Sequence, residues 1–155
     1  MKQIHLGCKP DEVLVKALDV PRKAVRHHND KGRVCNTLQK HLNEVGMIDE
    51  DPMAPQTTYL ASLLVVADES KCNLRVLTDV PRGHKVIIIC PRLEEWIMQV
   101  SVGKQVDMGH FGLTSKASTL HKLITSRLDQ FNNLVSHLLD QQAEPILHLQ
   151  RLLNS

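Results

Sequence analysis

Four consecutive aliphatic residues, at positions 86–89 (Val-Ile-Ile-Ile), constrain the fold of this chain more than any other feature. Successive side chains of a β-strand point to opposite faces of a sheet, so a strand without polar positions is covered on both faces. After Pro91, the apolar residues Leu93, Trp96, Ile97 and Val100 recur at helical spacing. The pattern predicts a central strand enclosed by helices, followed by a helix that starts at Pro91.

The segments before this strand alternate between strand and helix patterns. Strands are expected at residues 3–8, 24–28, 45–48 and 74–77, and a turn at 79–83 joins the last of these to residues 85–90. A first helix is expected to start at Asp11-Glu12, and a second to start at Asn29 or Asp30 and end at Gly46. A third is expected to start at Thr57 or Thr58, with an apolar face formed by Leu60, Leu63, Leu64 and Ala67. Such alternation predicts an α/β fold, with a largely parallel sheet and helices on both faces.

The pattern changes beyond Gly112. Apolar residues from Leu120 to Leu139 recur at spacings of three and four, which is typical of a continuous helix, and a break at Glu144-Pro145 leads into a last amphipathic helix. We therefore expect an α/β domain over residues 1–112 and a helical extension over residues 113–155, packed on the same domain. The extension either covers the sheet or offers a surface to a protein partner or to a second copy of the chain.

Length and composition favour one ordinary globular domain. Of the 155 residues, 42% are hydrophobic and only 3% are aromatic, so the core must be aliphatic. The net charge of +2 is too small to indicate nucleic-acid binding without a local basic face. The four cysteines form no CxxC pair and are interpreted as reduced core residues. Because no segment has the pattern of a signal peptide or a membrane span, we expect a cytoplasmic protein without a membrane segment.

An acidic pair follows the predicted strand at 45–48. In an open parallel sheet, ligands bind beyond the carboxyl ends of the strands. Asp49 and Asp51 are one residue apart, so both can face one hard cation, and Mg²⁺ is usually held by one or two carboxylates with phosphate and water oxygens. Alternatively, the two carboxylates cap the loop and are exposed to solvent. Asp11, Glu12, Glu94 and Glu95 follow other strands at the same edge, although the helix dipole favours Glu94 and Glu95 whatever the function.

A second polar segment runs from His27 to Arg33. Lys31 and Arg33 lie beside glycine and a predicted helix N-terminus, which together suit a phosphate group. The histidine pair His27-His28 suits acid–base chemistry or transition-metal binding, and an exposed polar loop is the alternative interpretation. The P-loop, dinucleotide and hydrolase-elbow motifs are absent from the sequence.

The order of these motifs resembles that of TOPRIM-type domains, the α/β fold of topoisomerases, primases and overcoming-lysogenization-defect nucleases. Residues 6–12 (Leu-Gly-Cys-Lys-Pro-Asp-Glu) resemble the first family motif and residues 48–51 (Ile-Asp-Glu-Asp) the second. Residues 91–96 (Pro-Arg-Leu-Glu-Glu-Trp) are similar to a helix start in small TOPRIM-like proteins of bacteria and phage, many of them uncharacterised. The resemblance covers about the first hundred residues, and the family's catalytic glutamate falls at Gly7.

This resemblance implies Mg²⁺- or Mn²⁺-dependent phosphoryl transfer, of the nuclease type, on nucleic acid. In that interpretation the metal ligands are Asp49, Asp51, Glu94 and Glu95, and the phosphate-binding residues are Lys31, Arg33 and Arg92. Gly7 cannot transfer a proton, so the acid or base would come from Asp11, Glu12, His27 or His28. The alternative is a non-catalytic TOPRIM-like module that binds nucleic acid or protein at the same edge.

Overall fold

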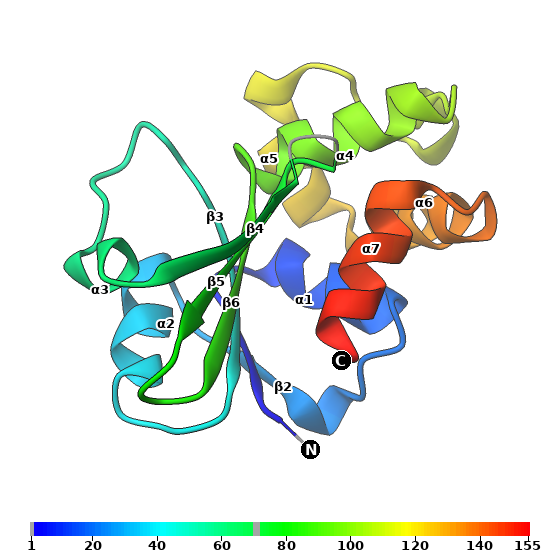
Figure 1. The fold of residues 1–155 in the computed structure, drawn as a ribbon. Coiled ribbons are helices and arrows are strands. Elements are labelled where there is room, and N and C mark those ends of the chain that lie inside the picture. Colours follow the sequence, from blue (N-terminus) through cyan, green and yellow to red (C-terminus); the bar gives the residue numbers. More distant parts are fainter. Residues whose placement is uncertain (1, 70–71) are drawn as a thin grey trace.

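The computed structural model describes residues 2–69 and 72–155, and these residues form one six-stranded sheet between two helical layers (Figure 1). The strand order is β2-β1-β3-β6-β5-β4. Four neighbouring strands are parallel, namely β2 (Val25–His27), β1 (Ile4–Leu6), β3 (Val45–Asp49) and β6 (His84–Ile89). The antiparallel strands β5 (Leu74–Asp79) and β4 (Leu64–Glu69) extend the sheet on the other side. The expected α/β class with a mostly parallel sheet is confirmed.

One face of the sheet carries most of the helices. They are α1 (Lys9–Ala17), α4 (Leu93–Gly103), α5 (Ala117–Ser126), α6 (Leu128–Asp140) and α7 (Glu144–Leu153). Short 3-10 turns lie at Arg22–Ala24 and Met108–Phe111. Trp96 of α4 is fully buried in this core, and its indole N–H donates to the carbonyl of Cys72 at 2.8 Å. Phe131 and Leu149 belong to the same core, so the C-terminal helices pack on the sheet.

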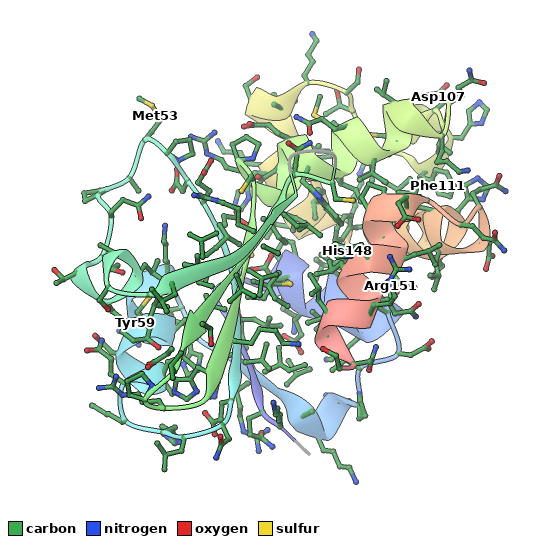
Figure 2. All side chains as sticks on the ribbon, viewed as in Figure 1. Met53, Tyr59, Asp107, Phe111, His148 and Arg151 are labelled. Carbon is green, nitrogen blue, oxygen red and sulfur yellow. The ribbon has the colours of Figure 1, made fainter. Side chains whose placement is uncertain are left out.

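The opposite face carries α2 (Lys31–Leu38) and α3 (Thr58–Ala61) over a smaller core. Tyr59 of α3, labelled in Figure 2, is buried there, and its hydroxyl donates to Asp79 at 2.8 Å. The loop between β3 and α3 carries Met53, which is 86% exposed and extends away from the body of the protein (Figure 2).

The apolar run at 86–89 is a central strand, as its sequence predicts. In β6 these residues are at most 4% exposed, and β6 lies between β3 and β5. The helix after it begins at Leu93 rather than at Pro91. Arg92 is the N-cap residue and has an extended backbone (φ −147°), so the helical conformation starts only at Leu93. The Cys90–Pro91 peptide is cis.

The prediction of a helix from Thr57 through Ala67 is wrong in its second half. Thr57 does cap α3, with its hydroxyl accepting from the Leu60 N–H, but that helix ends at Ala61. From Leu64 onward the chain is β4, paired with β5. Leu64 and Val65 therefore follow strand propensity and pair with Thr78 and Leu77 of β5, and the register shifts between Val65 and Ala67.

Gly46 does not close a helix, contrary to the sequence prediction. The helix α2 ends at Leu38, and Gly46 lies within β3 directly under it. A Cβ atom at position 46 would lie 2.9 Å from Cδ1 of Leu38, so the glycine allows α2 to pack closely on the sheet. Leu42, expected on the inner face of that helix, is 66% exposed in the connection.

The apolar stripe between Leu120 and Leu139 belongs to two helices rather than one. Arg127, with φ −133° and ψ 56°, separates α5 from α6. Helical spacing continues across the break because both helices turn an apolar face to the same core.

No disulfide joins the four cysteines, which all lie within the described residues. Cys35 and Cys72 are buried, as expected of core residues, whereas Cys8 and Cys90 are only partly buried. Within the described residues, we find no helix with both the length and the hydropathy needed to cross a bilayer.

Candidate functional site

Two adjacent pockets open where β1, β3 and β6 end. The smaller has a volume of about 130 Å³ and is lined by Gly7, Cys8, Asp11, Lys31, Ile48, Asp49 and Asp51. The larger has a volume of about 410 Å³ and is lined by Asp49, Asp51, Arg92, Glu94, Glu95, Ala117, Ser118 and His121. Because Asp49 and Asp51 line both, the two pockets form one continuous candidate site.

Asp49 ends β3, and its carboxylate accepts the backbone N–H of Leu93, the first residue of α4. Burial, followed by the charges of Glu94 and Asp51, raises the pKa of Asp49 to about 6, against the opposing effects of the Leu93 N–H and of His121. The Oδ1 atom is buried and accepts no hydrogen bond from the described residues. The side chain thus contacts the start of α4 through one oxygen and leaves the other without a hydrogen-bond partner in the described residues.

Asp11 lies in the first turn of α1 and is 2% exposed. Burial raises the pKa of this carboxyl well above its usual range, and the charges of Asp49 and Glu94 act in the same direction, while a hydrogen bond from Cys8 opposes them. Its Oδ1 atom also has no hydrogen-bond partner among the described residues. Burial and the adjacent Asp11 likewise raise the pKa of the Cys8 thiol, which disfavours the thiolate.

Glu94 lies in the first turn of α4 and is 8% exposed. One carboxylate oxygen, Oε1, is bonded to Nδ1 of His121, and the other, Oε2, is buried without a partner in the described part of the chain. Asp11, Asp49 and Glu94 therefore each bring one unsatisfied buried oxygen to the site. A buried carboxylate oxygen without a partner is unfavourable by at least about 1–3 kcal/mol, and either a proton or a cation relieves this.

Two basic side chains lie on either side of this acidic group. Lys31, at the start of α2, lines the smaller pocket and donates to the carbonyl of Glu50 at 2.9 Å. Arg92 lines the larger pocket, where its Nε lies 3.3 Å from Oδ1 of Asp51 and its Nη1 donates to Glu95 at 2.8 Å.

The structure brings together most of the residues expected from the sequence: Asp11, Lys31, Asp49, Asp51, Arg92, Glu94 and Glu95. The other four line neither pocket. Glu12 pairs with Lys9 and Lys16 along α1. His27 is exposed, and Arg33 is exposed beside Asp30. His28 is bonded to His5.

His121 was not expected at this site. It lies on α5, within the segment interpreted from the sequence as a cover or a partner surface, and it reaches the acidic group through Glu94. The N-terminal residues of α5, Ala117 and Ser118, line the same pocket. A single histidine on an amphipathic helix has no motif around it, and only the packing of α5 against α4 places it here.

The donor set fits a hard cation, because oxygen atoms of Asp and Glu are the ligands that Mg²⁺ and Mn²⁺ prefer. Among the side chains that the structure describes, however, no three of His, Cys, Asp or Glu are already arranged to hold a metal ion. The carboxylates would therefore have to turn toward a common point when a cation binds.

Comparison with known proteins leaves the family open. No protein-family model matches the chain, and neither the curated proteins nor the solved structures contain a significant match to it. The resemblance to TOPRIM-type domains stays a prediction from the sequence motifs.

Proposed function

We propose that this chain binds a divalent cation, Mg²⁺ or Mn²⁺, through Asp11, Asp49, Asp51 and Glu94, and that it catalyses phosphoryl transfer of the nuclease type on nucleic acid. The proposal rests on three carboxylates, buried Asp11 and Glu94 and partly buried Asp49, which each have one buried oxygen without a hydrogen-bond partner in the described residues and lie around two pockets that share Asp49 and Asp51.

The electrostatics favour cation binding. The raised pKa values of Asp11 and Asp49 mean that, without a cation, protons relieve the repulsion among the carboxylates. A divalent cation relieves the same repulsion and would displace those protons, so its binding is expected to release protons and to strengthen as the pH rises.

The surroundings also support a phosphate ligand. Lys31 and Arg92 carry positive charge on opposite sides of the carboxylates. The first residues of α5 line the larger pocket, and the N-cap residue Lys116 makes no side-chain cap, so backbone N–H groups there are available to an anion. When bound, a divalent cation neutralises phosphate charge and polarises the phosphoryl group.

The substrate class rests on the resemblance to TOPRIM-type domains. A phosphodiester carries one negative charge, and the carboxylates would repel it unless a cation is bound. We therefore expect the cation to be required for substrate binding as well as for turnover.

Gly7 favours a second candidate function. It lines the smaller pocket where the family motif has its catalytic glutamate, and its Cβ position lies 3.5 Å from the backbone N of Lys31. With a glycine there, the chain lacks the usual acid or base, which favours a module that binds cation and nucleic acid without turnover.

A nuclease assay on single- and double-stranded DNA and RNA, with and without Mn²⁺, tests the proposal. Wild type is compared with the double variant Asp49→Asn, Asp51→Asn and with Glu12→Gln, a carboxylate of α1 outside both pockets. Catalysis predicts Mn²⁺-dependent cleavage that falls at least about 100-fold in the double variant and is unchanged in E12Q. Mn²⁺-dependent binding without cleavage would support the second candidate, and cleavage unaffected by the double variant would contradict both.

A further inference from the structure

Three side chains, Glu44, His5 and His28, form a hydrogen-bonded series near the β2 edge of the sheet. None of the three lines either pocket of the candidate site. Oε2 of Glu44 lies 2.5 Å from Nε2 of His5, and Nδ1 of His5 lies 2.9 Å from Nε2 of His28. His5 is in β1 and is 3% exposed, whereas His28 follows β2 and is half-buried. The series therefore ties the short edge strand β2 to β1 and to the segment before β3.

The hydrogen-bonding roles in this series are determined by Glu44. An ionised carboxylate only accepts, so His5 must donate from Nε2–H and offer a lone pair at Nδ1. His28 must then donate its own Nε2–H to that lone pair. When both imidazoles are neutral, both hydrogen bonds form, and each imidazole has a defined tautomer.

The ring geometry suits a shared proton rather than a metal ion. The ring centroids are 5.1 Å apart while the facing nitrogens are 2.9 Å apart, so the rings meet end to end. A metal ion bonds to an imidazole nitrogen at about 2.0–2.1 Å, which leaves no room for one between these two atoms.

Protonation acts in two steps. A first proton is tolerated, because an imidazolium in the series still has Glu44 or the other imidazole as an acceptor. With a second proton the two facing nitrogens are both donors, and two positive charges lie 2.9 Å apart. Burial lowers the pKa of both His5 and His28; the hydrogen bond to Glu44 opposes this at His5, and the charge of His5 adds to it at His28.

Neighbouring charged groups make the His5–His28 contact more sensitive to a second proton. His41, before β3, lies with Nδ1 3.5 Å from Oε1 of Glu44 and therefore competes for the same carboxylate. The other titratable or charged groups that act on the pair are His84 of β6, His27 of β2 and Arg33 of α2, and their positive forms all oppose further protonation. Glu44 is the only anion among the described groups that act on the pair.

We propose that Glu44, His5 and His28 form a pH-sensitive clasp that holds β2 on β1 near neutral pH and releases it in mild acid. The strand β2 has three residues and pairs only with β1, so few other bonds hold it. His28 also donates its backbone N–H to the carbonyl of Leu6 at 2.8 Å, and this bond reports on the clasp directly. Three residues later, Lys31 lines the smaller pocket, so release of β2 would also displace a basic group of the candidate site.

Amide hydrogen exchange of the full chain, measured by NMR, tests the proposal. After correction for intrinsic rates, exchange of the His28 amide should be at least about tenfold faster at about pH 5 than at about pH 7.5. In the His28→Gln variant the side-chain amide can still donate to His5 but cannot be protonated, so this acceleration should fall to less than about threefold. The matched control His110→Gln, at an exposed histidine on a separate 3-10 turn, should behave as wild type.

Two outcomes would overturn the clasp. One is wild-type exchange of the His28 amide that does not change between the two pH values. The other is an acceleration of His28→Gln exchange between the two pH values that equals that of wild type, since the acceleration would then arise from groups other than these three side chains. Glu44→Gln provides a second variant. It removes the carboxylate that accepts from His5 and should shift the release of β2 to higher pH, and an unchanged midpoint would contradict the role of Glu44.

Discussion

Asp49, at the end of β3, lines the same pocket as Asp11, in the first turn of α1, where burial raises the pKa of the Asp11 carboxyl group and the charge of Asp49 raises it further. Two acids from different parts of the sequence are thus held in one buried environment by the parallel pairing of β1 and β3. Protons and cations compete for this environment, which makes both the stability and the ligand binding of the protein dependent on pH.

The pH dependence of stability should change in the Asp49→Asn variant. Because the pKa of Asp49 is raised from 3.8 to about 6 on folding, the folded state binds this proton more tightly than the unfolded state. Wild type therefore loses stability relative to the variant as the pH rises through this range, by on the order of 2 kcal/mol. Urea unfolding of both proteins in chelator, at several pH values from about 4 to 8, measures the difference. A constant difference at every pH would show that Asp49 has an ordinary pKa.

Removing His121 should raise the pKa of Asp49 further. The positive charge of His121 lowers that pKa in the folded protein, and His121→Gln removes the charge while keeping a hydrogen-bond donor near Glu94. Carbon-13 NMR titration of the aspartate carboxyl groups follows the change. His110→Gln is the control, because His110 lies beside Asp107 on a separate 3-10 turn. If both variants have the wild-type value, α5 makes no electrostatic contribution to the site.

A methyl group at Gly46 should destabilise the protein. Its Cβ would lie 2.9 Å from Cδ1 of Leu38, so α2 must shift on the sheet, at a cost of about 1–3 kcal/mol. Gly103, at the end of α4, has no atom within 4 Å of its Cβ position, and Gly103→Ala should be neutral or stabilising by up to about 1 kcal/mol. Thermal or denaturant unfolding of the two variants compares them. Equal stabilities would mean that α2 does not pack on β3 as described.

The sequence predicts the centre of the fold well because burial there depends on composition alone. Residues 86–89 have no polar position, so only a strand covered on both faces accommodates them. The errors lie where tertiary pairing overrides spacing. Leu64 and the residues after it fit a helical stripe in the sequence, but the edge of β5 offers them hydrogen bonds as a strand. Leu42 fits a helical face and is exposed, because α2 ends four residues earlier.

The candidate site was predictable where parallel topology governs it. Asp49 ends the parallel strand β3, Asp11 and Glu94 lie in the helices that follow β1 and β6, and the carboxyl ends of such strands meet at one edge. Position along the chain was a poor guide to side-chain direction, and Glu12, one residue from Asp11, points to lysines on the other side of α1. The contribution of His121 depends on helix packing over a long sequence separation, which no local pattern encodes.

Calorimetric titration with Mg²⁺, and separately with Mn²⁺, tests the central claim most directly. The titrations compare wild type with the Asp49→Asn, Asp51→Asn double variant and with Glu12→Gln, at about pH 7.5 in two buffers of different ionisation enthalpy. We expect saturable binding to wild type and E12Q with release of protons, and binding weakened at least about tenfold in the double variant. Absence of binding to wild type, or equal binding to all three proteins, would contradict the claim that these carboxylates form a cation site.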